Sequence, residues 1–313
     1  MRRYILLIAL STGFLAFSQE SLPVYQQYLL GGKFLINPAH YGETDDVVLH
    51  GTYQKQFSKF EQSPNVQSIG LHANVFDRVG AGLSFFRDQN GPISANGITA
   101  GASYFIPLSD DERKDQFSFG TGVNFYNMSI DLAMLNPKDQ GDPLLQEGAN
   151  DIFMVYGNLG MQATLKNFSA GISVSDIPLS DHVSVINAIE PSPTKYILTA
   201  GYDWQISDGL SVEPSVLMNL NSNSSRTFDL NLLGKVYDDT NLFEAGVSFR
   251  TTKDRVGSQQ LSLSPVIKGK INRFTFGAVY NLGLSDVQTY GGDSFMLSLG
   301  YNFENFINTR GFR

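Results

Sequence analysis

Apolar and polar residues alternate along most of this chain with a period of two. In residues 294–303, every second side chain is large and apolar, and those between are mostly small or polar: Phe295, Leu297, Leu299, Tyr301 and Phe303 against Met296, Ser298, Gly300 and Asn302. The same pattern recurs in residues 116–128, 195–206 and 272–282. Because successive side chains of a β-strand point to opposite faces, the pattern predicts strands that lie between an apolar and a polar environment.

Fourteen windows carry this alternation, and we expect a strand in each: residues 47–61, 66–76, 79–88, 94–106, 116–128, 152–165, 168–175, 195–206, 210–220, 226–237, 241–250, 259–269, 272–282 and 294–303. Most windows are close to the length of about 9–11 residues with which a tilted strand crosses a bilayer. Strands of soluble sandwiches average only about five or six residues. Pro214 and Pro265 weaken two of the windows, because proline donates no ladder hydrogen bond.

The residues on the two faces favour a membrane barrel over a soluble sandwich. One face carries Gly, Ser, Thr and Asn, which suits a crowded polar lumen. Aromatic residues recur near window ends, as interfacial girdles require: Phe57, Phe60, Phe85, Phe86, Tyr202, Trp204, Tyr301 and Phe303. Because every backbone N–H and C=O group must be hydrogen-bonded within the protein in lipid, the strands must form a closed barrel. We therefore predict an all-β, transmembrane, antiparallel up-and-down barrel.

The lengths of the connections support the strand count. Long connections follow odd-numbered strands, at residues 129–151, 176–194, 251–258 and 283–293. Connections after even-numbered strands are short, at residues 77–78, 166–167, 207–209, 238–240 and 270–271, with 107–115 the exception. Outer-membrane barrels show this asymmetry, with tight turns on the periplasmic side. An even count then places both mature termini in the periplasm of a Gram-negative cell.

We expect the barrel to comprise residues 47–303, with separate segments before and after it. Residues 1–18 read as a cleaved signal peptide, with Arg2 and Arg3 before an apolar stretch, and with Ala16 and Ser18 at the cleavage positions. Residues 19–46 lack alternation and are expected to form a periplasmic arm or a lumen segment that acts as a partial plug. Residues 304–313 form a C-terminal tail.

Composition agrees with the barrel and excludes several functions. Charged residues make up 17% of the chain, and its mean hydropathy is −0.12, an average over two opposed strand faces. The net charge of −8 disfavours nucleic acid as a partner. The absence of Cys excludes disulfides, zinc–thiolate sites and iron–sulfur clusters.

The sequence offers little that could support catalysis. The four His residues have no metal-binding spacing. His72 shares a strand face with Asn74 and is the best candidate for a lipase-like wall site, but a polar lumen residue is the preferred interpretation. Asp139, Asp142 and Glu147 do not match a calcium loop. We expect no enzyme, no metal and no cofactor, and we attribute the period-two glycines to lumen crowding or strand bending.

A group of short motifs carries a family resemblance. Gln27-Tyr28 is followed by Asn37-Pro38-Ala39, by Gly42, and then by Asp88 with Gly91-Pro92 in the sequence DQNGP. With these motifs, the whole mature chain resembles the PorP/SprF family of the Bacteroidota type IX secretion system. Phe57 stands where the family often has Trp, which is a conservative departure.

The resemblance implies an outer-membrane barrel that contacts lipid and other components of the secretion system. Members of one type help to export and retain surface adhesins through the C-terminal domain of the cargo. Members of the other type belong to the core apparatus and associate with peptidoglycan-linked periplasmic partners. We favour the adhesin-partner type, because two long outer loops offer apolar side chains for docking: Leu132, Met134, Leu135, Val183, Val185 and Ile186.

A different class of function stays open at this point. A fourteen-stranded barrel is similar to fatty-acid transporters in strand number, and a polar lumen can conduct solutes. A passive pore or small-molecule transporter is therefore the alternative hypothesis, and it requires an open lumen.

Overall fold

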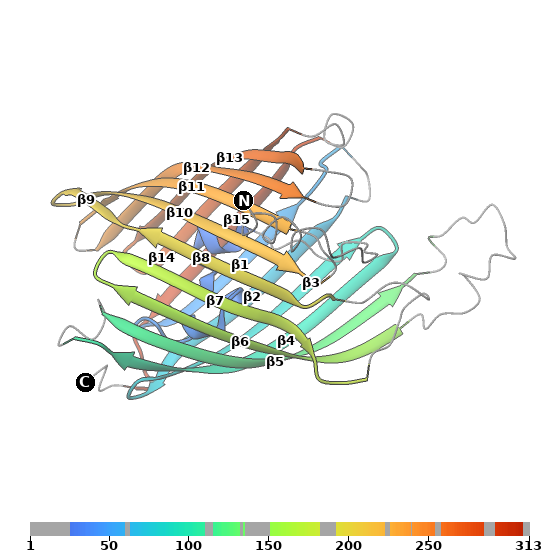
Figure 1. Ribbon diagram of the computed structural model, residues 1–313, viewed down its shortest axis with the longest axis horizontal. Helices are drawn as coiled ribbons and strands as arrows, with labels where there is room; N and C mark the ends of the chain where they lie inside the picture. Colours follow the sequence, from blue (N-terminus) through green and yellow to red (C-terminus); the bar gives the residue numbers. More distant parts are fainter. Residues whose placement is uncertain are drawn as a thin grey trace, which may run out of the picture.

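The computed structural model describes residues 26–59, 63–109, 115–131, 134, 151–181, 192–222, 226–238, 240–253, 258–284 and 292–308. Its strands form one closed antiparallel barrel (Figure 1). They are β1 Val47–Lys55, β2 Asn65–Phe76, β3 Val79–Asn90, β4 Ile93–Pro107, β5 Gln116–Ile130, β6 Asp151–Leu165, β7 Phe168–Pro178, β8 Lys195–Tyr202, β9 Trp204–Ser207, β10 Leu210–Asn221, β11 Arg226–Tyr237, β12 Asn241–Lys253, β13 Ser258–Ile271, β14 Phe274–Gly283 and β15 Ser294–Phe303.

The barrel closes where the first strand meets the last. β1 pairs antiparallel with β15, from Val47 opposite Phe303 to Lys55 opposite Phe295. The other strands pair with their sequence neighbours, except that β8 and β9 do not pair with each other and both pair with β10. The predicted fourteen-strand antiparallel barrel is confirmed, with β9 as one extra strand.

The two faces of each strand lie as the alternation predicted. In β15, Leu297 and Leu299 are 49% and 72% exposed on the outer surface, whereas Ser298 and Asn302 are buried. Phe86 does not take the outward position predicted for a girdle residue, because its neighbour Phe85 takes that position and Phe86 packs inside against Tyr126. Two adjacent residues of a strand cannot both face lipid. Phe60, another predicted girdle residue, lies outside the described residues.

Several predicted boundaries were wrong; β7 and β12, for example, each continue three residues past their predicted ends. The turn between β13 and β14 lies at Asn272-Arg273 instead of residues 270–271, because Asn272 tolerates the left-handed conformation (φ 54°) that β-branched Ile271 disfavours. β1 ends at Lys55 instead of residue 61, and Phe57 also has a positive φ of 50°. The window 195–206 is split at Asp203 into β8 and β9.

Both doubtful prolines lie within strands, at places where one ladder is interrupted. Pro214 of β10 pairs with β11 on one side, but on the other side it faces the break between β8 and β9. Pro265 of β13 pairs with β12 and falls in a gap of the β13–β14 ladder. A missing N–H costs little at such gaps, so the strands continue through the prolines.

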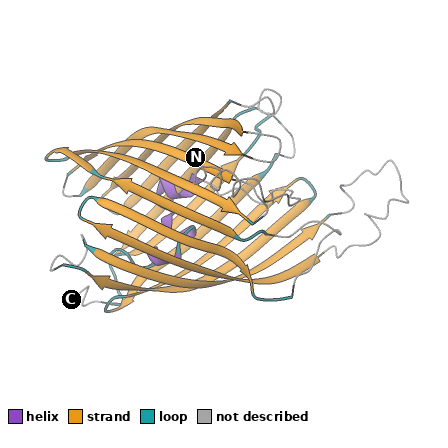
Figure 2. Cartoon of the chain, in the orientation of Figure 1, coloured by secondary structure: helices purple, strands orange, loops and turns teal. Residues whose placement is uncertain are grey.

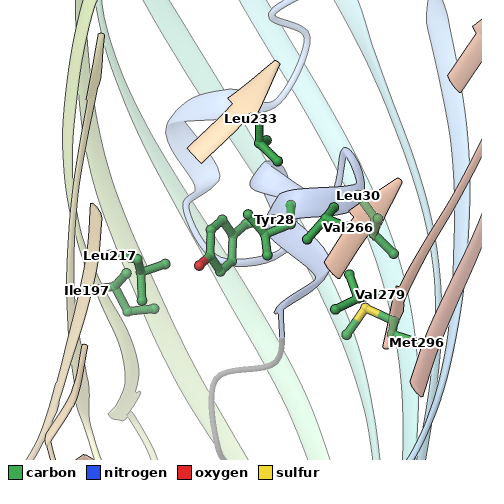
Figure 3. Packing of buried hydrophobic residues seen from close by; sticks show 9 residues of the cluster. Tyr28, Leu30, Ile197, Leu217, Leu233, Val266, Val279 and Met296 are labelled. Carbon is green, nitrogen blue, oxygen red and sulfur yellow. The ribbon is translucent and has the colours of Figure 1, made fainter. Parts of the chain in front are cut away.

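The described N-terminal residues lie inside the barrel (Figure 2). They form three short 3-10 helices, η1 Gln26–Leu30, η2 Lys33–Leu35 and η3 Pro38–His40. Leu29 and Leu30 pack against inward side chains of the wall, including Ile197 and Val279 (Figure 3). Among the described residues, no helix is long and apolar enough to span a membrane.

Candidate functional site

The candidate site is the lumen together with residues 26–46, which we call the lumen segment. Local sequence explains its compact turns: the Asn37 side chain accepts a hydrogen bond from the Ala39 N–H at 3.0 Å and caps η3, and Pro38 occupies the first position of that helix. Gly31 and Gly42 have φ values of 100° and 67°, a region that glycine adopts most readily. The segment is therefore built to fold back on itself inside the wall.

One end of the lumen segment is held by a buried ionic group. The Tyr28 hydroxyl donates a hydrogen bond of 2.6 Å to Asp229 of β11. Arg250 of β12 donates two further bonds to the same carboxylate, at 2.6 and 2.7 Å. No part of Asp229 is exposed. A fully buried carboxylate needs such partners, so Tyr28 completes a charged cluster of the wall.

The other end of the segment lies on strand glycines of β2 to β6. A side chain at Gly120 would collide with Pro38, and one at Gly160 would collide with Asn37. The Phe34 ring likewise covers Gly70, where an added Cβ would lie 2.5 Å from the ring. The predicted role of the period-two glycines in a crowded lumen is consistent with these contacts.

Hydrogen bonds between the wall and the lumen segment hold the segment in place along its length. The side-chain amide of Asn37 donates a hydrogen bond to the backbone carbonyl of Met161 at 3.1 Å. Ser173 of β7 donates to the Ile36 carbonyl at 2.7 Å, and Ser103 of β4 donates to the Tyr41 carbonyl at 2.5 Å. Strands β4, β6 and β7 on one side of the barrel, together with β11 through Asp229, thus hold one short segment.

The described histidines contribute to the contacts of the lumen segment. His72 is buried inside the barrel, and its Nδ1 accepts the Gly42 N–H at 3.1 Å. His50 bonds to the Leu30 carbonyl at 2.9 Å through Nε2. His40 lies 2.6 Å from Glu43 within the segment. His72 therefore faces the lumen, which agrees with the preferred interpretation of this residue.

Ion pairs line the lumen on the side of β8 to β13. Lys235 pairs with Asp203 at 2.6 Å and also with Glu213, and Lys268 pairs with Glu244 at 2.8 Å. Within the described ranges, no three His, Asp or Glu side chains gather as a metal site requires.

Described residues line two cavities inside the barrel beside the lumen segment. The first, which we call the outer cavity, has a volume of about 150 Å³ and lies between the segment and strands β2 to β8. The second has a volume of about 130 Å³ and contains Lys33, Glu213 and Lys235. Both cavities are bordered by the lumen segment.

The family-motif residues occupy two separate places. Gln27, Tyr28, Asn37, Pro38, Ala39 and Gly42 all belong to the lumen segment. Asp88 lies buried near the long-loop end of β3, and Gly91-Pro92 forms the turn into β4. The turn borders a rim cavity of about 280 Å³ together with Met134 and Tyr53.

Most of the candidate docking residues lie outside the described part of the chain. Met134 is described and is 48% exposed. The remaining candidates fall on residues that the structure does not describe: Leu132, Leu135, Val183, Val185 and Ile186. The rejected calcium candidates Asp139, Asp142 and Glu147 fall there too.

The Asp229–Arg250 pair is the functional feature that the sequence reasoning missed. Both residues lie on the polar face of adjacent predicted strands, and they are direct partners in the β11–β12 register. Opposite charges on the inward faces of neighbouring membrane-crossing windows are costly unless paired, and this signal could have identified them.

Comparison with solved structures supports the fold. The chain is similar to the TodX deltaS2S3 mutant monoaromatic hydrocarbon channel (TM-score 0.55, 11% identity, 92% of this chain and 97% of that chain covered). It is also similar to the CymD monoaromatic hydrocarbon channel (0.51, 13%, 92% and 94%) and to the toluene transporter TbuX of Ralstonia pickettii (0.50, 11%, 87% and 92%). At these identities the likeness concerns the outer-membrane barrel fold alone.

Comparison at the family level is more specific. No curated protein matches the chain. The family described as type IX secretion system membrane protein PorP/SprF matches residues 17–301, which include the lumen segment and almost the whole barrel wall. The chain therefore belongs to the PorP/SprF family of type IX secretion system membrane proteins.

Proposed function

We propose that this barrel assists the export of a secreted adhesin, or of another type IX cargo protein, and anchors it at the cell surface through the cargo's C-terminal domain. Family membership supports a role in type IX secretion. The short-turn end, where β1 begins and β15 ends, faces the periplasm in this proposal, together with both mature termini. The long loops then face the cell exterior, where a retained cargo must be held.

The observation that carries the proposal is the occupied lumen. The lumen segment bonds to strands β4, β6, β7 and β11, and two cavities beside it, lined by described residues, have volumes of about 150 and 130 Å³. A barrel filled in this way suits a docking platform better than a passive channel. The cargo is then expected to engage the loops at the long-loop end, where Met134 and the turn Gly91-Pro92 border the rim cavity.

Deletion of the gene tests the proposal. We expect one large cargo protein to be lost from the cell surface while other secreted proteins persist. Normal surface display of every cargo would contradict the proposal.

Loop variants locate the docking surface. Replacing Leu132, Met134 and Leu135 together by Ser should release cargo into the medium, as should the same change at Val183, Val185 and Ile186. Leu108→Ser is the matched control, because Leu108 is 53% exposed but lies at the short-turn end. Equal loss of cargo from the control would place docking elsewhere.

Two other functions predict different outcomes. A core-apparatus barrel linked to peptidoglycan-binding partners predicts that all cargo proteins are lost together on deletion. A pore or small-molecule transporter is favoured by the channel folds of the structural neighbours and predicts stable conductance of the intact protein.

A further inference from the structure

Two positively charged residues lie directly opposite each other on the outer surface of the barrel. Arg226 begins β11 and Lys253 ends β12, and the two residues are partners in the register of these neighbouring strands (Figure 1). Both residues are exposed. Directly opposed residues of an antiparallel pair have Cβ atoms about 4.5–5.5 Å apart, so the two cationic side chains extend from nearly the same place.

This pairing of like charges differs from the other charged pairs of the barrel. In the described strands, the other register partners that are both charged join opposite charges: Asp229 with Arg250, Lys235 with Glu244, and Glu244 with Lys268. Like charges that lie directly opposite each other destabilise a sheet. The packing of the strands therefore does not explain why Arg226 and Lys253 face each other.

The described part of the chain supplies no carboxylate for this pair. Neither Arg226 nor Lys253 forms an ion pair with a described residue. Their register neighbours on the flanking strands, Leu220 of β10 and Ser258 of β13, are uncharged. Asp254 follows Lys253 in the sequence but lies outside the described residues. An anion from outside the chain can therefore approach both cations together.

The outer surface next to the pair is apolar. On the same outward face, β11 continues with Phe228, Leu230 and Leu232, and β12 carries Val247, and all four side chains are exposed. A lipid has this combination of properties, because its acyl chains are apolar and its headgroup carries the charge. A small soluble anion would use only the charged part of the surface.

An aromatic residue marks the level of the pair relative to the membrane. Leu220 of β10 is the register partner of Arg226 on one side and of Tyr196 of β8 on the other, so the three residues lie in one row. Tyr196 is exposed on the outer surface. Tyrosine is enriched where the hydrocarbon meets the headgroups, so this row is expected at headgroup level.

We propose that Arg226 and Lys253 bind the phosphate of a membrane lipid whose headgroup is a phosphate monoester, and that its acyl chains lie along the apolar face of β11 and β12. A phosphate monoester carries a charge of about −1.5 to −2 at pH 7, which matches two cations. The Arg226 guanidinium can hold two phosphate oxygens at once, and the Lys253 ammonium acts as a point charge. The site does not depend on cargo export, so either proposal can fail without the other.

Three lipids with the same acyl chains test the site in the intact mature protein in neutral detergent micelles. Native mass spectrometry measures how tightly each lipid binds. We expect phosphatidic acid, a monoester, to bind at least about tenfold more tightly than phosphatidylglycerol or phosphatidylcholine, which are diesters. Glycerol 3-phosphate carries the same monoester without acyl chains, and at millimolar concentration it should not displace phosphatidic acid.

Variants place the binding at this pair. Arg226→Gln and Lys253→Gln should each weaken phosphatidic acid by about tenfold and leave phosphatidylcholine unchanged. Arg87→Gln is the matched control, because Arg87 is also exposed near the long-loop end of its strand, but its register partners Gln67 and Asn96 are uncharged. Asp254→Asn should change the affinity by less than about twofold if this carboxylate does not occupy the pair.

Protein stability gives a readout that does not depend on counting bound lipids. In neutral micelles, Lys253→Gln should raise the urea midpoint of unfolding, because it removes the repulsion from Arg226. In micelles that contain phosphatidic acid the order should reverse, because the lipid stabilises the wild type more strongly than the variant. A general loss of folding in the variant would lower the midpoint in both kinds of micelle.

Several results would overturn the proposal. Equal affinity for phosphatidic acid and phosphatidylglycerol would show that the second charge is not recognised. Equal weakening by Arg87→Gln and Lys253→Gln would indicate a general attraction of the surface for anionic lipids. Displacement by glycerol 3-phosphate would assign the site to a soluble phosphate, and a tenfold gain of affinity in Asp254→Asn would show that this carboxylate already neutralises the pair.

Discussion

At the scale of single residues, the barrel interior depends on a buried ion pair that also holds the lumen segment. Asp229 and Arg250 are partners on adjacent strands, and Tyr28 reaches the same carboxylate from a position 201 residues away in the sequence. Removing one partner of a buried pair leaves an uncompensated charge, which costs more than the pair itself contributes. This cluster should therefore dominate the energetics of the lumen.

Arg250→Ala should lower the free energy of unfolding by about 3–5 kcal/mol, because the Asp229 carboxylate would remain buried without its cation. Urea unfolding in micelles, followed by the change in electrophoretic mobility of folded barrels, measures the loss. Arg273→Ala is the control, since its pair with Glu304 is exposed and such pairs contribute little to stability. A similar loss of unfolding free energy in both variants would show that the Asp229 cluster does not stabilise the barrel more than an exposed ion pair does.

The Glu43 carboxylate gives the lumen segment a dependence on pH. Burial alone would raise the pKa of Glu43, but the neighbouring His40 outweighs this effect and lowers the pKa from 4.5 to about 2. A carboxyl group whose pKa is lowered in the folded state stabilises the fold at pH values above its ordinary pKa. This contribution is lost as the pH falls from about 4.5 towards 2.

The urea midpoints of wild type and Glu43→Gln should therefore differ at pH 6 and converge near pH 2. The Gln variant keeps the shape of the side chain and removes only the charge. A difference that stays constant across this pH range would contradict the role of the carboxylate.

At the scale of elements, the strands combine two requirements. Their outer faces are apolar for lipid, and their inner faces are small wherever the lumen segment lies against them. Gly120 of β5 and Gly160 of β6 are in direct contact with η3, so the wall there has no side chain between its backbone and the segment. Strand glycines are unfavourable in a sheet by themselves, and this close approach explains their presence.

Gly160→Ala should displace the lumen segment, because the new methyl group would collide with Asn37. Hydrogen exchange of the amides of residues 26–42 should become faster in this variant. Gly234→Ala is the control, since its nearest atom, the Ala245 carbonyl oxygen, would lie 3.7 Å from the added Cβ. Unchanged exchange in Gly160→Ala would mean that the segment does not rest on this glycine.

At the scale of the whole molecule, the barrel could be predicted from sequence because its periodicity is local. The alternation in residues 294–303 and 226–237 placed those two strands at their observed bounds. The break at Asp203 was not predictable, because residues 195–206 alternate through it and only the pairing with β10 shows the interruption.

The candidate site was harder to predict, because its contacts join distant parts of the chain. The family resemblance marked Tyr28 and Asn37, but their partners Asp229 and Met161 lie 201 and 124 residues away. The lumen segment has no period-two pattern, so the sequence left a periplasmic arm and a lumen segment open. The position of the lumen segment is determined by its packing against residues of the barrel wall that are distant in the sequence. A short stretch of sequence does not contain these contacts.

We propose that the lumen segment blocks the barrel, so that the molecule acts as a docking platform and not as a pore. Conductance of single molecules in planar bilayers tests the claim most directly, with a variant that lacks residues 26–41 as the comparison. We expect the wild-type protein to show little conductance and the variant to show large, stable conductance steps. Equally large, stable steps from the wild type would contradict it.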